Sequence, residues 1–156
     1  PHNTFIGERA GRTSTGQDNT FIGAHAGYSS TGNNNIAIGF WAGDNITSGA
    51  NNLIIGYNID APSATASNQM SIGNLIFATG VDGTGTTVSS GNVGIGTSTP
   101  ATDLHIWKTA SSTLQIGDAV KTGCLAMGDT DGAGISYITV LDGVLNATTT
   151  KPTICK

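Results

Sequence analysis

The chain of 156 residues carries a formal net charge of −4, only 10% of its residues are charged, and 37% are apolar. This acidic balance, with no basic run, argues against a nucleic-acid-binding or anionic-membrane-binding surface. No apolar stretch approaches the roughly 20 residues of a membrane-spanning helix. No segment shows the apolar spacing of an amphipathic helix, so the expected class is all-β.

A short repeat organises the first half of the chain. Segments with the pattern Asn-x-x-Ile-Gly recur every 16 or 17 residues, and the first three also carry an Ala-Gly pair and a Thr-Gly or Ser-Gly pair at matching offsets. This spacing predicts a parallel β-solenoid (β-roll) in which each coil has room for two short strands and two turns. The expected structural ladder is Asn3, Asn19, Asn35 and Asn52, with Ile6, Ile22, Ile38 and Ile55, and with Gly7, Gly23, Gly39 and Gly56.

These repeat positions favour structural roles over catalytic ones. Glycines at fixed offsets supply the positive φ angles that coil corners need. The asparagine that opens each unit is expected to stack on the next one as a ladder of side-chain amides.

Side chains in each predicted strand alternate between two faces. We expect the faces of Thr4 and Ile6, with their equivalents, to form the coil interior, and the Phe5 column to point outward. That column is apolar in its first four members, and a narrow solenoid has little private core. An apolar outer column predicts packing against a second copy of the chain, with a trimer favoured. The candidate interface residues are Phe5, Phe21, Ile54 and Trp41.

Three aromatic residues, Phe40, Trp41 and Tyr57, follow the corner glycines of two successive units. Packing at an interface and stacking against a surface glycan are both open interpretations, because rigid aromatic rings suit either partner.

The predicted organisation has three parts. Residues 1–76 are the regular solenoid, 77–106 are a degenerate continuation and connector, and 107–156 are a small β-hairpin module. The expected strands of this module are 113–116, 124–127, 135–141 and 144–148.

The two cysteines, Cys124 and Cys155, both lie in the last part. A disulfide between them would staple the tail to the module and place the protein in an oxidising, extracellular space. The alternative is two unpaired small hydrophobic residues.

Residues for catalysis, metal binding or cofactor binding do not assemble into a convincing pattern. The histidines lie in unrelated contexts, and Glu8 is the only glutamate. Residues 128–132, Gly-Asp-Thr-Asp-Gly, have oxygen ligands at alternate positions as calcium loops do, but lack the later bidentate acid, so a plain turn is preferred. We expect no enzyme activity and no cofactor.

The repeat begins at Asn3 without a preceding cap. Either a longer protein has been cut, or the open coil edge pairs with another subunit in an end-to-end polymer.

The unit Asn-x-x-Ile-Gly-x-x-Ala-Gly, over about residues 2–76, resembles the head repeats of trimeric autotransporter adhesins and related phage tail-fibre-type repeats. The stretch 91–97, Gly-Asn-Val-Gly-Ile-Gly-Thr, is similar to a segment that precedes the chaperone domain of tail fibres. The resemblance implies a left-handed parallel β-roll, with three chains about a fibre axis, and attachment to a surface or matrix without catalysis. A surface glycan or host receptor is a further partner that the sequence leaves open. Together these features predict an extracellular or cell-surface fibre subunit that self-associates through solenoid faces and open coil edges, with a trimeric adhesin or receptor-binding segment as the alternative.

Overall fold

The computed structural model describes residues 2–108, 125–128, 135–141 and 144–148. The chain forms two compact units, Pro1–Ser112 and Thr113–Lys156. All regular elements in the described residues are β-strands. The same residues contain no helix with the length and apolarity needed to cross a membrane.

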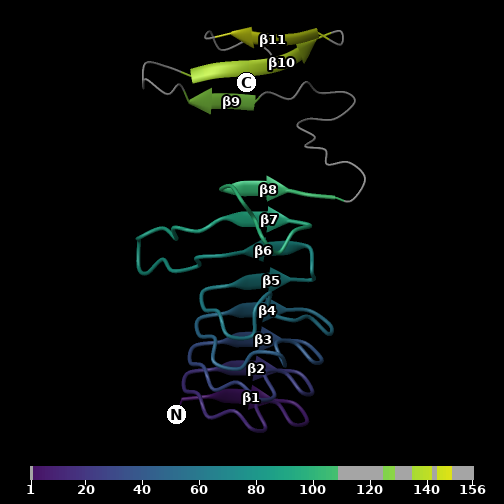
Figure 1. Ribbon diagram of the computed structural model, residues 1–156, viewed down its shortest axis with the longest axis vertical. Coiled ribbons are helices and arrows are strands. Elements are labelled where there is room, and N and C mark those ends of the chain that lie inside the picture. The colour runs from purple at the N-terminus through teal and green to yellow at the C-terminus, as the bar shows by residue number, and fades with distance from the viewer. Residues whose placement is uncertain (1, 109–124, 129–134, 142–143, 149–156) are drawn as a thin grey trace. The chain divides into compact units, whose positions relative to one another are not determined.

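The first unit is a β-solenoid with a single sheet of eight three-residue strands, stacked in chain order (Figure 1). The first five strands pair in parallel, in register, so each coil sits directly on the one before it. This arrangement confirms the all-β solenoid fold predicted from the repeat. The strands are β1 (Thr4–Ile6), β2 (Thr20–Ile22), β3 (Ile36–Ile38), β4 (Leu53–Ile55), β5 (Met70–Ile72), β6 (Ile76–Ala78), β7 (Val93–Ile95) and β8 (Leu104–Ile106).

Each regular coil contributes one strand to the sheet, and the expectation of two strands per coil is wrong. The rest of the coil is a series of tight turns. Backbone hydrogen bonds nevertheless continue around it from coil to coil: the amide of Gly11 donates to the carbonyl of Ala26, and that of Thr13 donates to Tyr28. The turns therefore stack as regularly as the strands do.

The regular coiling ends after β5. The chain reverses over residues 73–75, so β6 pairs antiparallel with both β5 and β7. A long excursion separates β6 from β7 (Figure 1), and β8 then pairs parallel with β7. The excursion lies within the segment 77–106 that was expected to be a degenerate continuation and connector, whereas strands β6 and β8 were not predicted.

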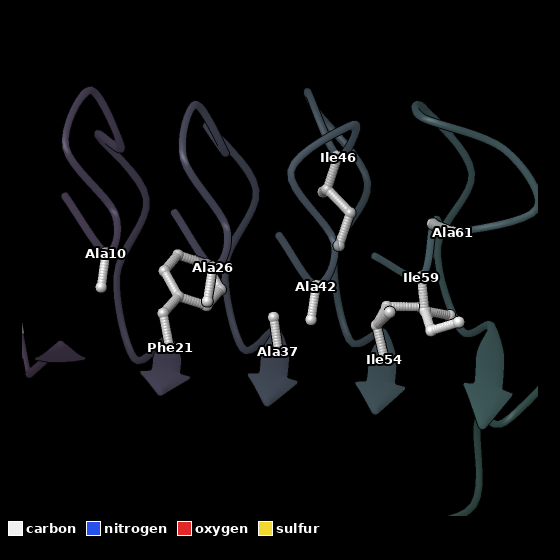
Figure 2. Close-up of a cluster of buried hydrophobic side chains, with 9 residues drawn as sticks. All are labelled: Ala10, Phe21, Ala26, Ala37, Ala42, Ile46, Ile54, Ile59 and Ala61. Atoms are coloured by element: carbon white, nitrogen blue, oxygen red, sulfur yellow. The ribbon is translucent and has the colours of Figure 1, made fainter. Parts of the chain in front are cut away.

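The middle residue of each strand points into the coil, which contradicts the predicted assignment of faces. Phe21, Ala37 and Ile54 are fully buried (Figure 2), and so is Ser71. The flanking strand residues are more exposed, as at Ile36 and Ile6. Phe21 and Ile54 are therefore core residues, and their proposed role at an interface is withdrawn.

Volume is balanced inside each coil. In the second and third coils, one inward position holds a large side chain and the other two hold small ones, whereas the fourth coil combines two isoleucines with one alanine. Such mixtures of sizes let a narrow interior reach close packing. The buried hydrophobic sets are Phe21 and Ala26 in the second coil, Ala37, Ala42 and Ile46 in the third, and Ile54, Ile59 and Ala61 in the fourth (Figure 2); Ser30 is also buried in the second coil.

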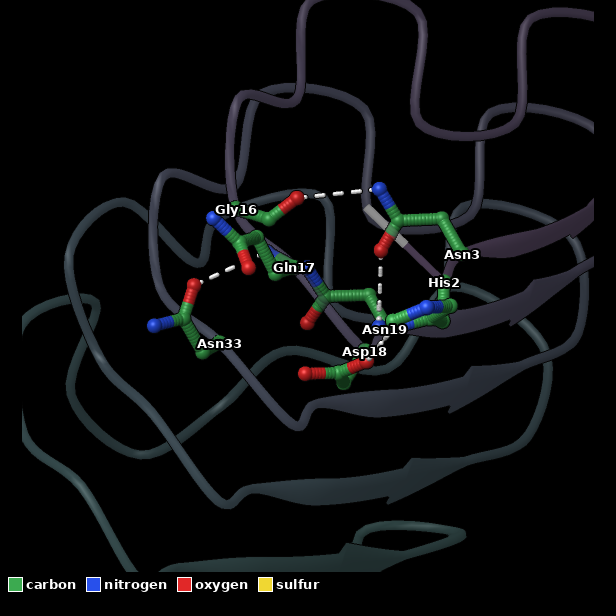
Figure 3. A network of polar contacts seen from close by, with 7 residues as sticks. All are labelled: His2, Asn3, Gly16, Gln17, Asp18, Asn19 and Asn33. Atoms are coloured by element: carbon green, nitrogen blue, oxygen red, sulfur yellow. Dashed lines mark hydrogen bonds and ion pairs between the residues drawn. The ribbon is translucent and has the colours of Figure 1, made fainter.

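The asparagines that open the coils lie inside, but their amides bond to backbone groups. The Oδ1 of Asn19 accepts from the amide of Asn35, and its Nδ2 donates to the carbonyl of Gly32. The same pair of bonds occurs one coil earlier, at Asn3 (Figure 3). Each asparagine thus closes its own coil and ties it to the next.

A ladder with direct bonds between side-chain amides exists elsewhere, at the residue that ends each coil. Asn34 donates to Asn51, and Asn51 donates to Asn68, both at 3.1 Å. These three residues have φ angles of 57–60°, which asparagine tolerates well. In the column of opening asparagines, by contrast, successive members are linked from side chain to backbone, and a direct bond between side-chain amides joins Gln69 to Asn52 at 3.3 Å.

The second unit contains a three-stranded antiparallel sheet in the order β11–β10–β9. Its strands are β9 (Leu125–Gly128), β10 (Ile135–Leu141) and β11 (Val144–Thr148). Both cysteines, most of the segment 128–132 and the expected strand 113–116 lie outside the described residues.

Candidate functional site

The outer face of the solenoid sheet carries an uninterrupted ladder of isoleucines. One outward position of every strand is isoleucine, and successive members are paired across the whole sheet. We call this column the isoleucine ladder; its members are Ile6, Ile22, Ile38, Ile55, Ile72, Ile76, Ile95 and Ile106.

A second column runs beside the ladder on the same face and is also uncharged. The residues of this column change from threonine to apolar residues along the stack. Its members are Thr4, Thr20, Ile36, Leu53, Met70, Ala78, Val93 and Leu104.

The two columns together form a long apolar strip. Strands in a sheet are about 4.8 Å apart, so seven steps make the strip about 34 Å long. Ile6 and Leu104, near its two ends, are 57% and 53% exposed, and Ile36 is 40% exposed. A contiguous apolar face of this kind marks a contact surface more often than free solvent-facing protein.

Of the four predicted interface residues, none belongs to this strip. Phe5 points inward with Phe21, and their rings stack at 5.1 Å. Phe5 is more exposed only because it lies in the first coil. Trp41 lies at a turn, away from the strand residues.

Trp41 belongs instead to an aromatic corner on coils two to four, which we define as Tyr28, His25, Trp41, Phe40 and Tyr57. The His25 and Trp41 rings are stacked at 4.3 Å, and Phe40 and Tyr57 are stacked at 5.4 Å. Phe40 meets Trp41 edge-on at 6.2 Å, and Tyr28 lies 5.6 Å from His25. The five rings are therefore one continuous group.

Three of these rings, Phe40, Trp41 and Tyr57, are predicted from the sequence as one aromatic group, and Tyr28 and His25 are not. His25 occupies the position of Trp41 one coil earlier, so the repeat itself carried the signal. Tyr28 lies three residues further on, at the turn position that Asp44 fills in the next coil.

The backbone at this corner has an unusual conformation for bulky residues. Arg9, His25 and Trp41 occupy equivalent positions with φ angles of 59°, 62° and 54°. Asn58 fills the same position in the fourth coil, as expected for a left-handed conformation. Non-glycine residues in that region cost roughly 1 kcal/mol or more each, and such positions cluster at functional sites.

Two carboxylates, Asp44 and Asp60, interact with each other on successive coils, and Asp44 lies three residues after Trp41. Partial burial, followed by the charge of Asp60 and a hydrogen bond with it, raises the pKa of Asp44 above its ordinary value of 3.8. Asp60 is exposed and Asp44 half-buried. The pair offers oxygen atoms that can accept hydrogen bonds from a ligand.

Metal-ligand groupings do not form among the described residues. No set of three or more His, Cys, Asp or Glu side chains there is placed to hold a metal ion. His2 pairs with Asp18, His25 stacks on Trp41, and His105 contacts Trp107.

Comparisons with protein-family models, with curated proteins and with solved structures give no match to this chain.

Proposed function

We propose that this chain is a non-enzymatic subunit of an extracellular fibre or filament and that it self-associates through the outer face of its solenoid sheet. The observation that carries the proposal is the isoleucine ladder, which leaves one apolar side chain of every strand on the outside. Burial of apolar surface contributes a favourable free energy of about 25 cal/mol per Å², so association that covers the strip is favoured over leaving it in water.

A second copy of the chain is the partner that fits this strip. Identical strips have the same strand spacing, so side chains of one copy can interdigitate with those of another along the full length. No charged side chain lies in either column, so copies meet without unpaired buried charge. Three copies with their strips turned to a common axis would cover all three strips, and a trimer is the assembly we favour.

Lysine substitutions in the strip test the proposal. The double variant Ile38→Lys/Ile55→Lys places two charges at the centre of the ladder, where they would be buried without partners in an assembly. We expect the wild-type protein to have a multiple of the chain mass in light scattering, and the double variant to shift towards the monomer.

The matched control is Thr65→Lys, which adds the same kind of charge at an exposed turn residue. It should leave the mass unchanged. A monomeric wild-type protein would contradict the proposal, as would equal effects of Thr65→Lys and the ladder variant.

A further inference from the structure

The aromatic corner has a chemistry that self-association through the sheet does not use. Its residues lie on turns, whereas the strip consists of strand residues. We propose that this corner binds a neutral carbohydrate, with a sugar ring stacked on Tyr57 and its hydroxyls held by neighbouring polar groups.

Tyr57 provides the open ring face. One side of its ring stacks on Phe40, and the side chain is still 76% exposed. The coil that would follow is replaced by the reversal at 73–75, and the residue after the corresponding glycine is Asn74. The stack of aromatic residues therefore ends at Tyr57 with one ring face uncovered. An aromatic face of this kind suits the C–H face of a pyranose.

The rings behind Tyr57 hold it in a fixed orientation. Phe40 is stacked on it and contacts Trp41, and Trp41 is stacked on His25. A preorganised platform of this kind loses less side-chain entropy on binding than a lone exposed ring does. A role in supporting Tyr57 would explain why bulky residues occupy the positions of His25 and Trp41, where the backbone is left-handed.

The repeat places one polar acceptor at the turn position equivalent to that of Tyr28, and others next to it in space or next to Tyr57 in sequence. Asp44 occupies the turn position at which Tyr28, one coil earlier, contacts the rings of His25 and Trp41. Asp60 lies beside Asp44, and the exposed Asn58 directly follows Tyr57. Carboxylate and amide groups next to an aromatic face match the alternating hydroxyls and C–H groups of a sugar.

Other occupants fit the corner less well. Nucleic acids and anionic membranes would be repelled by the two carboxylates. A cationic side chain would be attracted by the carboxylates. However, sites that recognise cations through aromatic rings usually form a cage in which several ring faces surround the cation. Here the rings are nearly parallel only within each of the two close stacks, at interplanar angles of 6° and 14°, and the two rings of a stack cover each other.

Binding of the labelled protein to an array of neutral oligosaccharides tests this inference, with polylysine spots included on the same surface. We expect the wild type to bind at least one neutral glycan, and Tyr57→Ala to lose about tenfold or more of that affinity because the stacking face is removed. Tyr57→Phe should keep most of the binding, since it retains the ring.

The control is Val88→Ala, a change at an 86% exposed residue in the excursion at 79–91. Absence of glycan binding by the folded wild type, or equal glycan binding by Tyr57→Ala, would overturn the inference. Binding to polylysine alone, lost in Asp44→Asn/Asp60→Asn, would overturn it in favour of a cationic partner. The mass of Tyr57→Ala in solution should equal that of the wild type, so this test is independent of self-association.

Discussion

Ile72 of β5 and Ile76 of β6 lie directly opposite each other, although the chain reverses its direction between them. In the regular coils, paired isoleucines follow automatically from the repeat. At this reversal the repeat is broken, and the ladder nevertheless continues through Ile76 to Ile95 and Ile106. The outer apolar face therefore persists where the coil does not, which supports a role for the face itself.

The buried asparagines should matter far more to stability than the exposed ones. Asn35→Ala removes a fully buried amide that accepts from Asn52 and donates to Gly49. It leaves buried backbone groups without partners, at a cost of about 3 kcal/mol of unfolding free energy.

The adjacent variant Asn34→Gly is the control for that prediction. It removes an exposed bond to Asn51 and keeps a residue that tolerates the φ angle of 58°. The free energy of unfolding of Asn34→Gly should fall by less than about 1 kcal/mol. Chemical denaturation at one protein concentration measures both, and similar losses would contradict the assigned roles.

Substitutions at two glycines, Gly32 and Gly85, distinguish two reasons for glycine: steric crowding between coils and a left-handed backbone conformation. A Cβ at Gly32 would overlap the carbonyl oxygen of Gly49 in the next coil, whereas a Cβ at Gly85 meets nothing within 4 Å. We expect Gly32→Ala to cost about 3 kcal/mol or more, because the coils must move apart. Gly85→Ala should cost only about 1 kcal/mol, the penalty of its φ angle of 60°. If thermal unfolding ranks the two variants in the opposite order, the close approach of coils is not what requires glycine here.

The corrected orientation of the strands predicts unequal effects at two phenylalanines. Phe21→Ala should destabilise the solenoid by about 3–5 kcal/mol, because it opens a cavity in a closed interior. Phe5 is 37% exposed, so Phe5→Ala should cost clearly less. If the Phe21 side chain pointed outward, as the sequence suggested, Phe21→Ala would lower the free energy of unfolding only slightly. Urea unfolding of the two variants distinguishes the two orientations.

The pH dependence of stability should contain a component from Asp44. Its raised pKa means that the folded state binds a proton more readily than the unfolded chain does. Stability from this group is therefore present at low pH and is lost as the pH rises from just above 3.8 through the raised pKa. Asp44→Asn should flatten this decline and melt at a higher temperature than the wild type at neutral pH. A wild-type stability that rises with pH over that range, and that Asp44→Asn leaves unaltered, would contradict this assignment.

The period, the strand positions and the parallel stacking of the first coils could be predicted from the sequence, because each repeat carries the same marks. The orientation of the strands could not be obtained from apolarity alone, since both faces are apolar. A constant isoleucine column suggests a core, yet the narrow interior requires side chains that differ in size from coil to coil, as Phe21 and Ala37 do. The spacing of Asn19 and Phe21 could have indicated the orientation. Side chains two residues apart in an extended segment lie on the same face, so a buried Asn19 places Phe21 inside as well.

The remaining features depend on where the repeat fails. Strand β6 lacks both the opening asparagine and the closing glycine, so only its pairing with β5 identifies it. The aromatic corner requires knowledge of which turn positions stack across coils, which becomes clear once His25 is placed against Trp41.

Photo-cross-linking from within the ladder tests the central claim most directly. Ile55 is replaced by the photoreactive residue benzoylphenylalanine, and cross-linked peptides from a mixture of isotope-labelled and unlabelled protein are identified by mass spectrometry. Face-to-face packing predicts links between labelled and unlabelled chains that end on ladder residues or their neighbouring column. Links confined to one chain, or links between chains that form equally well from the same probe at Thr65, would contradict self-association through the sheet face.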